Sequence, residues 1–192
     1  MTKSDLDARL KNDATDNKFL IDGDYIVFDK KSNLNYEVIP HFTLKVLLTS
    51  NPLSKTRLSK GVLLSLNTLR ETVDCPFTIR ASYHSPEYHL LSFGFHDSDL
   101  YTTGNALSIG VPPDFVEPLL NAVQSDTKIG EYGVYSWGLH IGYTKDAKTW
   151  DFRKDAPKNQ LLTNLLTNDK MKNIALIGAA AAAVWFFFIK GK

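Results

Sequence analysis

The strongest constraint on this chain is an apolar segment near its C-terminus, within NIALIGAAAAAVWFFFIKGK. Residues 174–189 carry no charged or strongly polar side chain. As an α-helix they would extend about 24 Å, at about 1.5 Å per residue, against a hydrocarbon core of about 30 Å. Lys170, Lys172, Lys190 and Lys192 flank the segment with long stems that can reach the headgroups. The segment predicts one transmembrane helix, with a buried core helix as the alternative.

One end of this segment is aromatic, as is typical of a membrane interface. The residues that we assign to the membrane anchor are Ile174, Trp185, Phe186, Phe187, Phe188 and Ile189. Upstream, residues 157–173 carry pairs of leucines on one helical stripe, which predicts an amphipathic juxtamembrane helix. The polar residues 1–18 lack the apolar core of a signal peptide, so we expect a single-pass protein with a C-terminal anchor. The balance of Lys and Arg slightly favours a cytoplasmic position for the remainder.

The rest of the chain has the composition of one folded domain. Hydrophobic residues make up 43% of the 192 residues, which is enough for a packed core. A net charge of +1 argues against a nucleic-acid partner, and the single cysteine, Cys75, excludes an internal disulfide. We expect a mobile or loosely helical arm and a short strand over residues 1–40, and the domain itself over residues 41–156.

Short strands and helices follow one another without regular alternation, which predicts the α+β class. The patterns predict strands at 25–29, 77–85, 105–112, 129–137 and 138–144, and helices beginning near Thr43, over 61–74, after Pro86 and over 112–123. The last two strands would form a hairpin. We therefore expect a small antiparallel sheet with flanking helices, followed by the transmembrane helix.

Three stretches of this domain carry a resemblance: FTIRASYHSPEYH at 77–89, YTTGNALSIG at 101–110 and WGLHIGYT at 137–144. In this order they resemble the zinc peptidases of the D-alanyl-D-alanine carboxypeptidase type, above all the small phage and bacterial peptidoglycan peptidases that share the hedgehog signalling-domain fold. Such enzymes hold zinc through a His-x-x-Gly-x-Ala-x-Asp loop and a later His, with an acid shortly before that His as general base. Three protein ligands leave zinc a position for the water that it activates.

Most of the metal ligands of that pattern are replaced in this chain. Gly104 and Ala106 match the loop, but its first ligand position holds Tyr101 and its acidic position holds Ser108. The later ligand is kept as His140, and the position expected for the base holds Trp137. Serine and neutral tyrosine are poor zinc ligands beside imidazole and carboxylate. The resemblance therefore implies a vestigial site without metal and without catalysis.

Two alternatives remain open for this site. A rearranged zinc site could draw on His96 and Asp99 together with His140, which would make the chain an active peptidoglycan peptidase. The old cleft could instead bind a sugar or peptide without cleaving it. The candidate lining residues for such a cleft are His84, Tyr101, Ser108, Trp137 and His140. Aromatic residues near the strands of a small domain more often belong to the core.

Resemblance and anchor together suggest a membrane-anchored, catalytically inactive peptidase-like protein that acts as a structural or binding module. A virion protein of a lipid-containing phage fits this description. Its setting would be the internal membrane of the particle or the inner membrane of the host. The expected partners are the lipid bilayer, capsid or other membrane proteins, and peptidoglycan.

Overall fold

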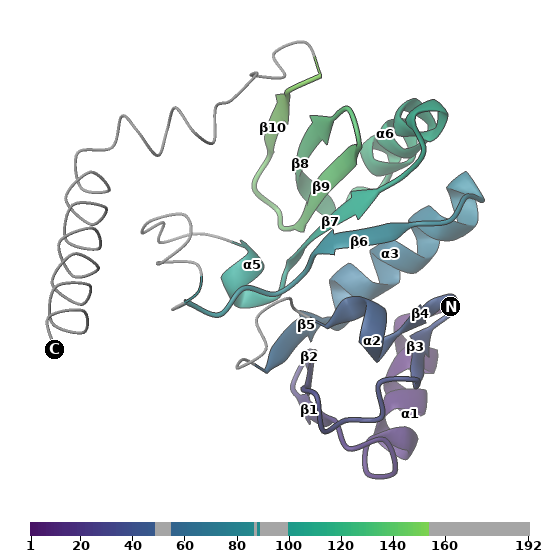
Figure 1. Ribbon diagram of the computed structural model, residues 1–192, viewed down its shortest axis with the longest axis vertical. Helices are drawn as coiled ribbons and strands as arrows, with labels where there is room; N and C mark the ends of the chain where they lie inside the picture. The colour runs from purple at the N-terminus through teal and green to yellow at the C-terminus, as the bar shows by residue number, and fades with distance from the viewer. Residues whose placement is uncertain (49–54, 87, 89–99, 154–192) are drawn as a thin grey trace, which may run out of the picture. The chain divides into compact units, whose positions relative to one another are not determined.

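The computed structural model describes residues 1–48, 55–86, 88 and 100–153 (Figure 1). The chain divides into two units, Met1–Lys154 and Asp155–Lys192, and all described residues belong to the first. The class is α+β, as predicted, with three small sheets and several helices. The predicted segments 157–173 and 174–189 lie outside the described residues. Within the part that the structure describes, no helix is long and apolar enough to cross a membrane.

The largest sheet has five strands in the order β10-β8-β9-β7-β6. Their bounds are Thr78–Ala81 for β6, Ala106–Gly110 for β7, Ile129–Tyr135 for β8, Gly138–Tyr143 for β9 and Lys148–Asp151 for β10. The predicted hairpin is present as β8 and β9. The sheet is mixed rather than wholly antiparallel, because β10 runs parallel to β8 at one edge.

The two faces of this sheet differ because successive side chains of a strand point to opposite sides. Leu107 and Ile109 of β7, and Leu139 and Ile141 of β9, are wholly buried in the hydrophobic core. This face packs on the helices α3 (Lys60–Val73) and α6 (Val116–Ser125). The alternate residues of the same strands, Ser108 and His140 among them, lie on the opposite side, which we call the His140 face.

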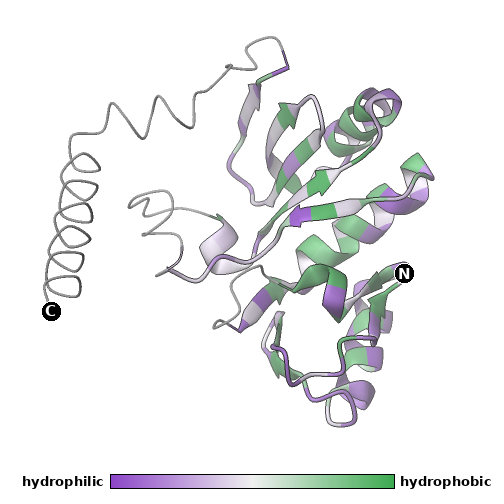
Figure 2. Cartoon of the chain, in the orientation of Figure 1, coloured by the Kyte–Doolittle hydropathy of each residue, from purple (hydrophilic) through white to green (hydrophobic). Residues whose placement is uncertain are grey.

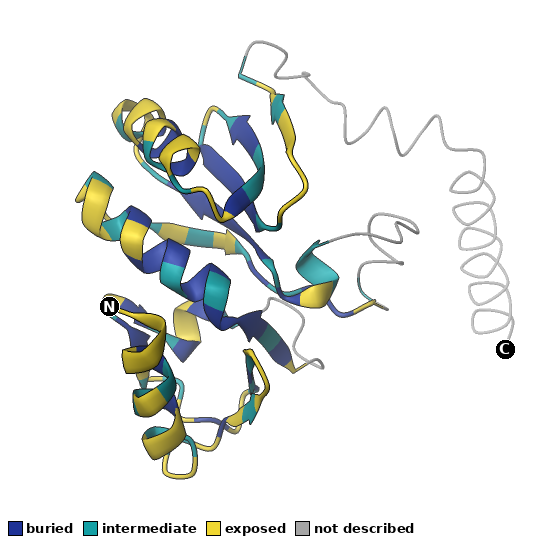
Figure 3. Ribbon diagram, turned by 180° about the vertical axis from the view of Figure 1, so that it is seen from behind, coloured by how far each residue is buried: buried dark blue, intermediate teal, exposed yellow. Residues whose placement is uncertain are grey.

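Helix α3 lies between the large sheet and the N-terminal elements (Figures 1 and 3). It begins at an N-cap, Ser59, whose Oγ accepts a hydrogen bond from the Val62 amide at 3.2 Å. Leu63, Leu66 and Leu69 recur every three residues and are buried, each contributing about 2 kcal/mol by loss of apolar surface. The helix ends at Asp74 in the left-handed conformation. Its apolar stripe is visible in Figure 2.

The N-terminal part adds two small antiparallel sheets. One has the order β1-β2-β5 and the other pairs β3 with β4. Their bounds are Leu20–Asp22 for β1, Tyr25–Phe28 for β2, Thr56–Ser59 for β5, Glu37–Ile39 for β3 and Phe42–Thr43 for β4. The helix expected near Thr43 is a single turn, α2 (Leu44–Leu47).

The mobile or loosely helical arm expected over residues 1–18 is helical in its larger part, and it packs on the domain. Residues Lys3–Asp13 form helix α1, which contacts α3. A capping box between Thr2 and Asp5 closes its first turn. Leu6 and Leu10, four residues apart, are both wholly buried. Two leucines in an otherwise polar stretch are a weak periodic signal, but they are sufficient to anchor a helix once a complementary surface is present.

Candidate functional site

Three of the positions that the resemblance selects are joined by hydrogen bonds to the hydroxyl of one of them, Tyr101. Tyr101 belongs to the short helix α5 (Leu100–Thr103), which precedes β7. Its hydroxyl lies 2.5 Å from Ser108 Oγ and 2.8 Å from His140 Nδ1. Ser108 and His140 are Cα partners on the neighbouring strands β7 and β9. We call these three residues, together with Glu131 described below, the His140 cluster.

The turn that aims Tyr101 at Ser108 requires a glycine. Gly104 has φ +78°, and its amide donates to the Tyr101 carbonyl at 3.2 Å. A Cβ at this position would fall on the carbonyl oxygen of Arg57, whose backbone passes directly beside it. A side chain is therefore excluded by both backbone conformation and space. Gly104, which matches the glycine of the zinc-peptidase loop, thus has a structural role that does not depend on a metal.

The second ring nitrogen of His140 is also engaged. Glu131 of β8 places Oε1 at 3.0 Å from His140 Nε2, and its Oε2 lies 3.8 Å from Lys148 Nζ. The His140 hydrogen bond holds the pKa of Glu131 below its usual value, with Lys148 adding to the effect and partial burial opposing it. Sequence reasoning missed Glu131. The available signal was the alternation of the hairpin, which places Glu131 and His140 on the same face.

A row of cross-strand partners runs from β10 to β7 through the cluster: Trp150, Gly133, His140 and Ser108. Because Gly133 has no side chain, the Trp150 indole lies over it and stacks on the His140 ring at 5.2 Å between centroids. Trp150 Nε1 donates to the Tyr135 hydroxyl at 3.0 Å. These contacts leave His140 with an exposed fraction of only 5%. Trp150 was not among the residues that the sequence selected.

The other predicted site residues differ in how close they lie to the His140 cluster. His84 is buried and stacks on the Tyr101 ring at 4.6 Å, so it borders the cluster. Trp137 lies at the β8–β9 turn, stacked on Tyr135 at 4.8 Å, and reaches the cluster only through Tyr135 and Trp150. The alternative metal residues His96 and Asp99 lie outside the described residues.

One arrangement of protons satisfies every polar atom of the His140 cluster. Glu131 accepts from Nε2 of His140, Nδ1 accepts from the Tyr101 hydroxyl, and the Tyr101 oxygen accepts from Ser108. This arrangement leaves neither imidazole nitrogen with a lone pair directed at a metal. In the part of the chain that the structure describes, no group of three His, Cys, Asp or Glu side chains could hold a metal ion. The four side chains form one continuous hydrogen-bonded chain.

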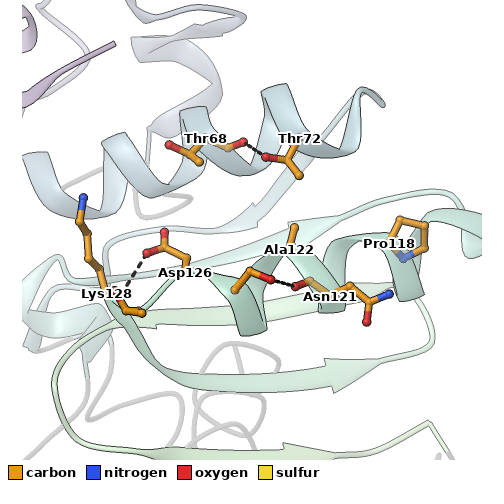
Figure 4. A pocket seen from close by; sticks show the side chains of 9 residues that line it. Thr68, Thr72, Pro118, Asn121, Ala122, Asp126 and Lys128 are labelled. Carbon is orange, nitrogen blue, oxygen red and sulfur yellow. Dashed lines mark hydrogen bonds between the residues drawn. The ribbon is translucent and has the colours of Figure 1, made fainter.

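A further hollow lies elsewhere, between α3 and α6 on the helical side of the sheet (Figure 4). It measures about 460 Å³ and contains none of the predicted site residues. Several of its polar groups are satisfied locally: Thr72 donates to the Thr68 carbonyl at 2.8 Å and Ser125 to the Asn121 carbonyl at 2.9 Å. These two hydroxyl groups are therefore bonded within their own helices.

Comparisons with known proteins add no further assignment. No protein-family model matches the chain, and neither a curated protein nor a solved structure matches it.

Proposed function

We propose that this chain is a non-catalytic protein of the D-alanyl-D-alanine carboxypeptidase type, anchored in a membrane by residues 174–189, with a structural role. The observation that carries the proposal is the state of His140. Both of its ring nitrogens are used by neighbouring side chains, Tyr101 and Glu131, and its ring is stacked on Trp150. A metal would have to displace at least one of these partners, and the nearby oxygens of Tyr101 and Ser108 are poor zinc ligands.

The convergence of Tyr101, Ser108 and His140 supports the choice of family. Tyr101 and His140 are 39 residues apart in the sequence, yet their side chains form a hydrogen bond. The three positions that match the ligand pattern of a zinc peptidase thus lie together, as such an ancestry requires. The simplest explanation is that a metal-binding arrangement has been replaced, residue by residue, with hydrogen-bonding side chains.

The aromatic residues favour a structural role over the stacking of a sugar ring. Trp137 packs against Tyr135 and carries the Arg80 guanidinium at 4.8 Å from its ring centre. Trp150 stacks on His140 and has Lys148 Nζ at 5.5 Å from its ring centre. A saccharide would have to compete with these contacts for the ring faces. The setting that we propose is the internal membrane of a lipid-containing phage or the inner membrane of its host, with a capsid or membrane protein as partner.

Elemental analysis and zymography of the full chain in detergent test this proposal. We expect zinc far below one equivalent per chain, and no clearing of a peptidoglycan gel with or without added zinc. Stoichiometric zinc together with clearing that a chelator abolishes would establish the alternative, an active zinc peptidase.

Restoring the missing ligands tests the family itself. The double variant Tyr101→His and Ser108→Asp would present two imidazoles and one carboxylate, the usual number of protein ligands at a catalytic zinc. We expect it to bind zinc at least about 100-fold more tightly than the parent chain, as measured by competition with a chromogenic chelator. The matched control, Tyr25→His with Ser136→Asp, introduces the same residue types away from His140. Equal zinc affinity in the two variants would remove the support for a peptidase ancestry.

A further inference from the structure

Aromatic side chains gather at one end of the His140 face, and we call this group the aromatic row: Trp137, Tyr135, Trp150 and Phe152. The Tyr135 ring stacks on Trp137 at 4.8 Å between centroids and lies 5.5 Å from the ring of Phe152. Its hydroxyl accepts the Trp150 indole N–H at 3.0 Å. Trp150 lies opposite Gly133 in the register, and Tyr135 and Phe152 each follow one of these two by two residues. All of them therefore share one face of the sheet.

The aromatic row is partly exposed to solvent. Phe152 has an exposed fraction of 40%, although it is a large apolar side chain. Trp137, Tyr135 and Trp150 are each half-buried. Because the rings stack on one another, they present their edges rather than their faces to the surroundings. A contiguous group of exposed apolar side chains of this kind is typical of an interaction surface.

A cation lies at each end of the aromatic row. The Arg80 guanidinium carbon is 4.8 Å from the ring centre of Trp137, and Lys148 Nζ is 5.5 Å from the ring centre of Trp150. Arg80 is exposed, and the Lys148 side chain is 69% exposed. Glu131 lies 3.8 Å from Lys148, but its side chain is only 16% exposed. The charges that meet solvent at the two ends of the row are therefore positive.

The exposed acidic side chain of β10 points to the opposite face. Asp151 alternates with Trp150 and Phe152, so it lies on the helical side of the sheet. It pairs with Arg153 at 2.6 Å, and Arg153 also bonds Glu117 of α6. This separation of charges leaves the aromatic row between cations, which suits a surface of anionic headgroups.

The described chain ends beside the aromatic row. Phe152 is followed by Arg153, and residues 154–173 connect it to the apolar segment 174–189. A connection of 20 residues spans at most about 70 Å when it is fully extended. A folded unit on so short a connection meets the bilayer surface at a high effective concentration.

We propose that the aromatic row and its two flanking cations bind the phospholipid surface of the membrane that holds residues 174–189. Trp and Tyr side chains favour this interface because the ring is apolar while its N–H or O–H group stays hydrated. Phe152 supplies apolar surface, and the long side chains of Arg80 and Lys148 reach the phosphates. The inference rests on the anchor proposed above and adds a second contact with the same bilayer.

Fluorescence quenching by brominated lipids tests this surface in the full chain. The parent for this experiment carries Trp185→Phe, so that Trp137 and Trp150 are the only remaining tryptophans. It is reconstituted into vesicles of phosphatidylcholine and phosphatidylglycerol, with or without bromine atoms on the acyl chains. We expect bromination to quench the emission of both tryptophans, and the quenching to weaken at high salt.

Removal of the two cations tests the electrostatic part. Arg80→Gln combined with Lys148→Gln should lower the ratio of docked to undocked chains about fivefold for each charge removed. The control, Lys11→Gln with Lys128→Gln, removes two exposed positive charges that lie outside the large sheet. It should be quenched like the parent chain.

Removal of the exposed phenyl group tests the apolar part. Phe152→Ser should lower the docked ratio by at least about fivefold. The control is Leu20→Ser on β1, which removes an apolar side chain that is 62% exposed and should leave the quenching unchanged. Circular dichroism of each variant reports whether the fold is kept.

Flotation of the same samples separates this surface from the anchor. A chain that fails to float contradicts the anchor, and the surface with it. A chain that floats while Trp137 and Trp150 escape quenching contradicts the surface alone, as does equal quenching of the charge variant and its control. Shielding of Trp137 from acrylamide that is already present in detergent and rises with protein concentration would assign the row to a second copy of the chain instead.

Discussion

At the scale of single residues, the main feature of the His140 cluster is a histidine whose two ring nitrogens both already have hydrogen-bond partners. Buried polar atoms are costly when unpaired, so both nitrogens of a buried imidazole require partners. Tyr101 supplies one of these partners, because its hydroxyl can donate to His140 and accept from Ser108 at the same time. Glu131 supplies the other. Each residue of the cluster thus satisfies a hydrogen-bonding group of the next.

Removal of the Tyr101 hydroxyl tests this account. Tyr101→Phe would leave Ser108 and one nitrogen of His140 without their partner, and both side chains are more than 90% buried. We expect the free energy of unfolding to fall by about 1–3 kcal/mol, as measured with urea. The control is Tyr132→Phe, whose hydroxyl accepts an exposed bond from Gln124 at 3.1 Å. It should cost less than about 0.5 kcal/mol. A similar loss in the two variants would contradict the role that we give to Tyr101.

The bond between Glu131 and His140 predicts a particular dependence of stability on pH. The folded-state pKa of Glu131 lies below its ordinary value of 4.5, so the fold favours the ionised carboxylate. The stabilisation is therefore fully present above that ordinary value, and it is lost as the pH falls through the lower folded-state pKa.

Glu131→Gln removes the charge at nearly constant size. We expect the difference in unfolding free energy between the parent and this variant to be largest near neutral pH and to shrink in acid below the ordinary carboxyl range. Urea titrations across the pH range measure it, with the exposed Glu37→Gln as the control. A difference that stays constant with pH would show that Glu131 acts through its shape rather than its charge.

At the scale of elements, strand β10 completes the enclosure of His140. It adds to β8 in parallel at the edge of the sheet, with Trp150 opposite Gly133 and Asp151 opposite Val134. The Phe152 amide donates to the Val134 carbonyl at 2.8 Å just beyond the strand. Gly133 is the position on which this contact depends, because any side chain there would occupy the space of the Trp150 indole.

Gly133→Ala tests the docking of β10. The added methyl group would displace the Trp150 ring from His140, and we expect a loss of about 1–3 kcal/mol in unfolding free energy. The Trp150 indole N–H signal, which reports its bond to Tyr135, should shift at the same time. In Gly23→Ala, no atom lies near the added Cβ and the only cost is that of a φ of +57°. This control should leave the Trp150 signal unchanged.

At the scale of the whole molecule, the folded unit and the C-terminal segment differ in how their apolar side chains are distributed along the chain. The unit Met1–Lys154 is built on one hydrophobic core, to which α1, α3, α6 and the strands β7, β8 and β9 contribute. Residues 174–189 are apolar throughout, so no polar face remains for water. A continuous apolar segment of this kind favours a lipid environment over an aqueous one.

Flotation with phosphatidylcholine vesicles tests the anchor. We expect the full chain to float with the vesicles and a chain lacking residues 174–189 to stay behind. Ala181→Arg places a charge in the middle of the segment and should weaken insertion by about 2.5–3.5 kcal/mol. Asn173→Arg adds the same charge at the flank and should float like the parent. Unchanged flotation of the Ala181→Arg chain would contradict a membrane-spanning anchor.

Local patterns were sufficient to predict several elements. The leucine spacing of α3 and the alternation of β8 and β9 were visible in the sequence, because the periods of 3.6 and 2 residues follow from backbone geometry. The placement of Tyr101 near Ser108 and His140 entered only through the resemblance. Helix α1 was underestimated, since Leu6 and Leu10 carry little weight until the surface that buries them is known.

The sequence by itself determined the α+β class and the periodic patterns of α3, β8 and β9. Only the tertiary structure decided what surrounds His140. Glu131 reaches His140 through the strand register, and Trp150 reaches it across Gly133 from a strand that no local pattern pairs with β8. The physical reason is that side-chain hydrogen bonds and ring contacts act over a few ångströms in space, whereas the sequence records only distance along the chain.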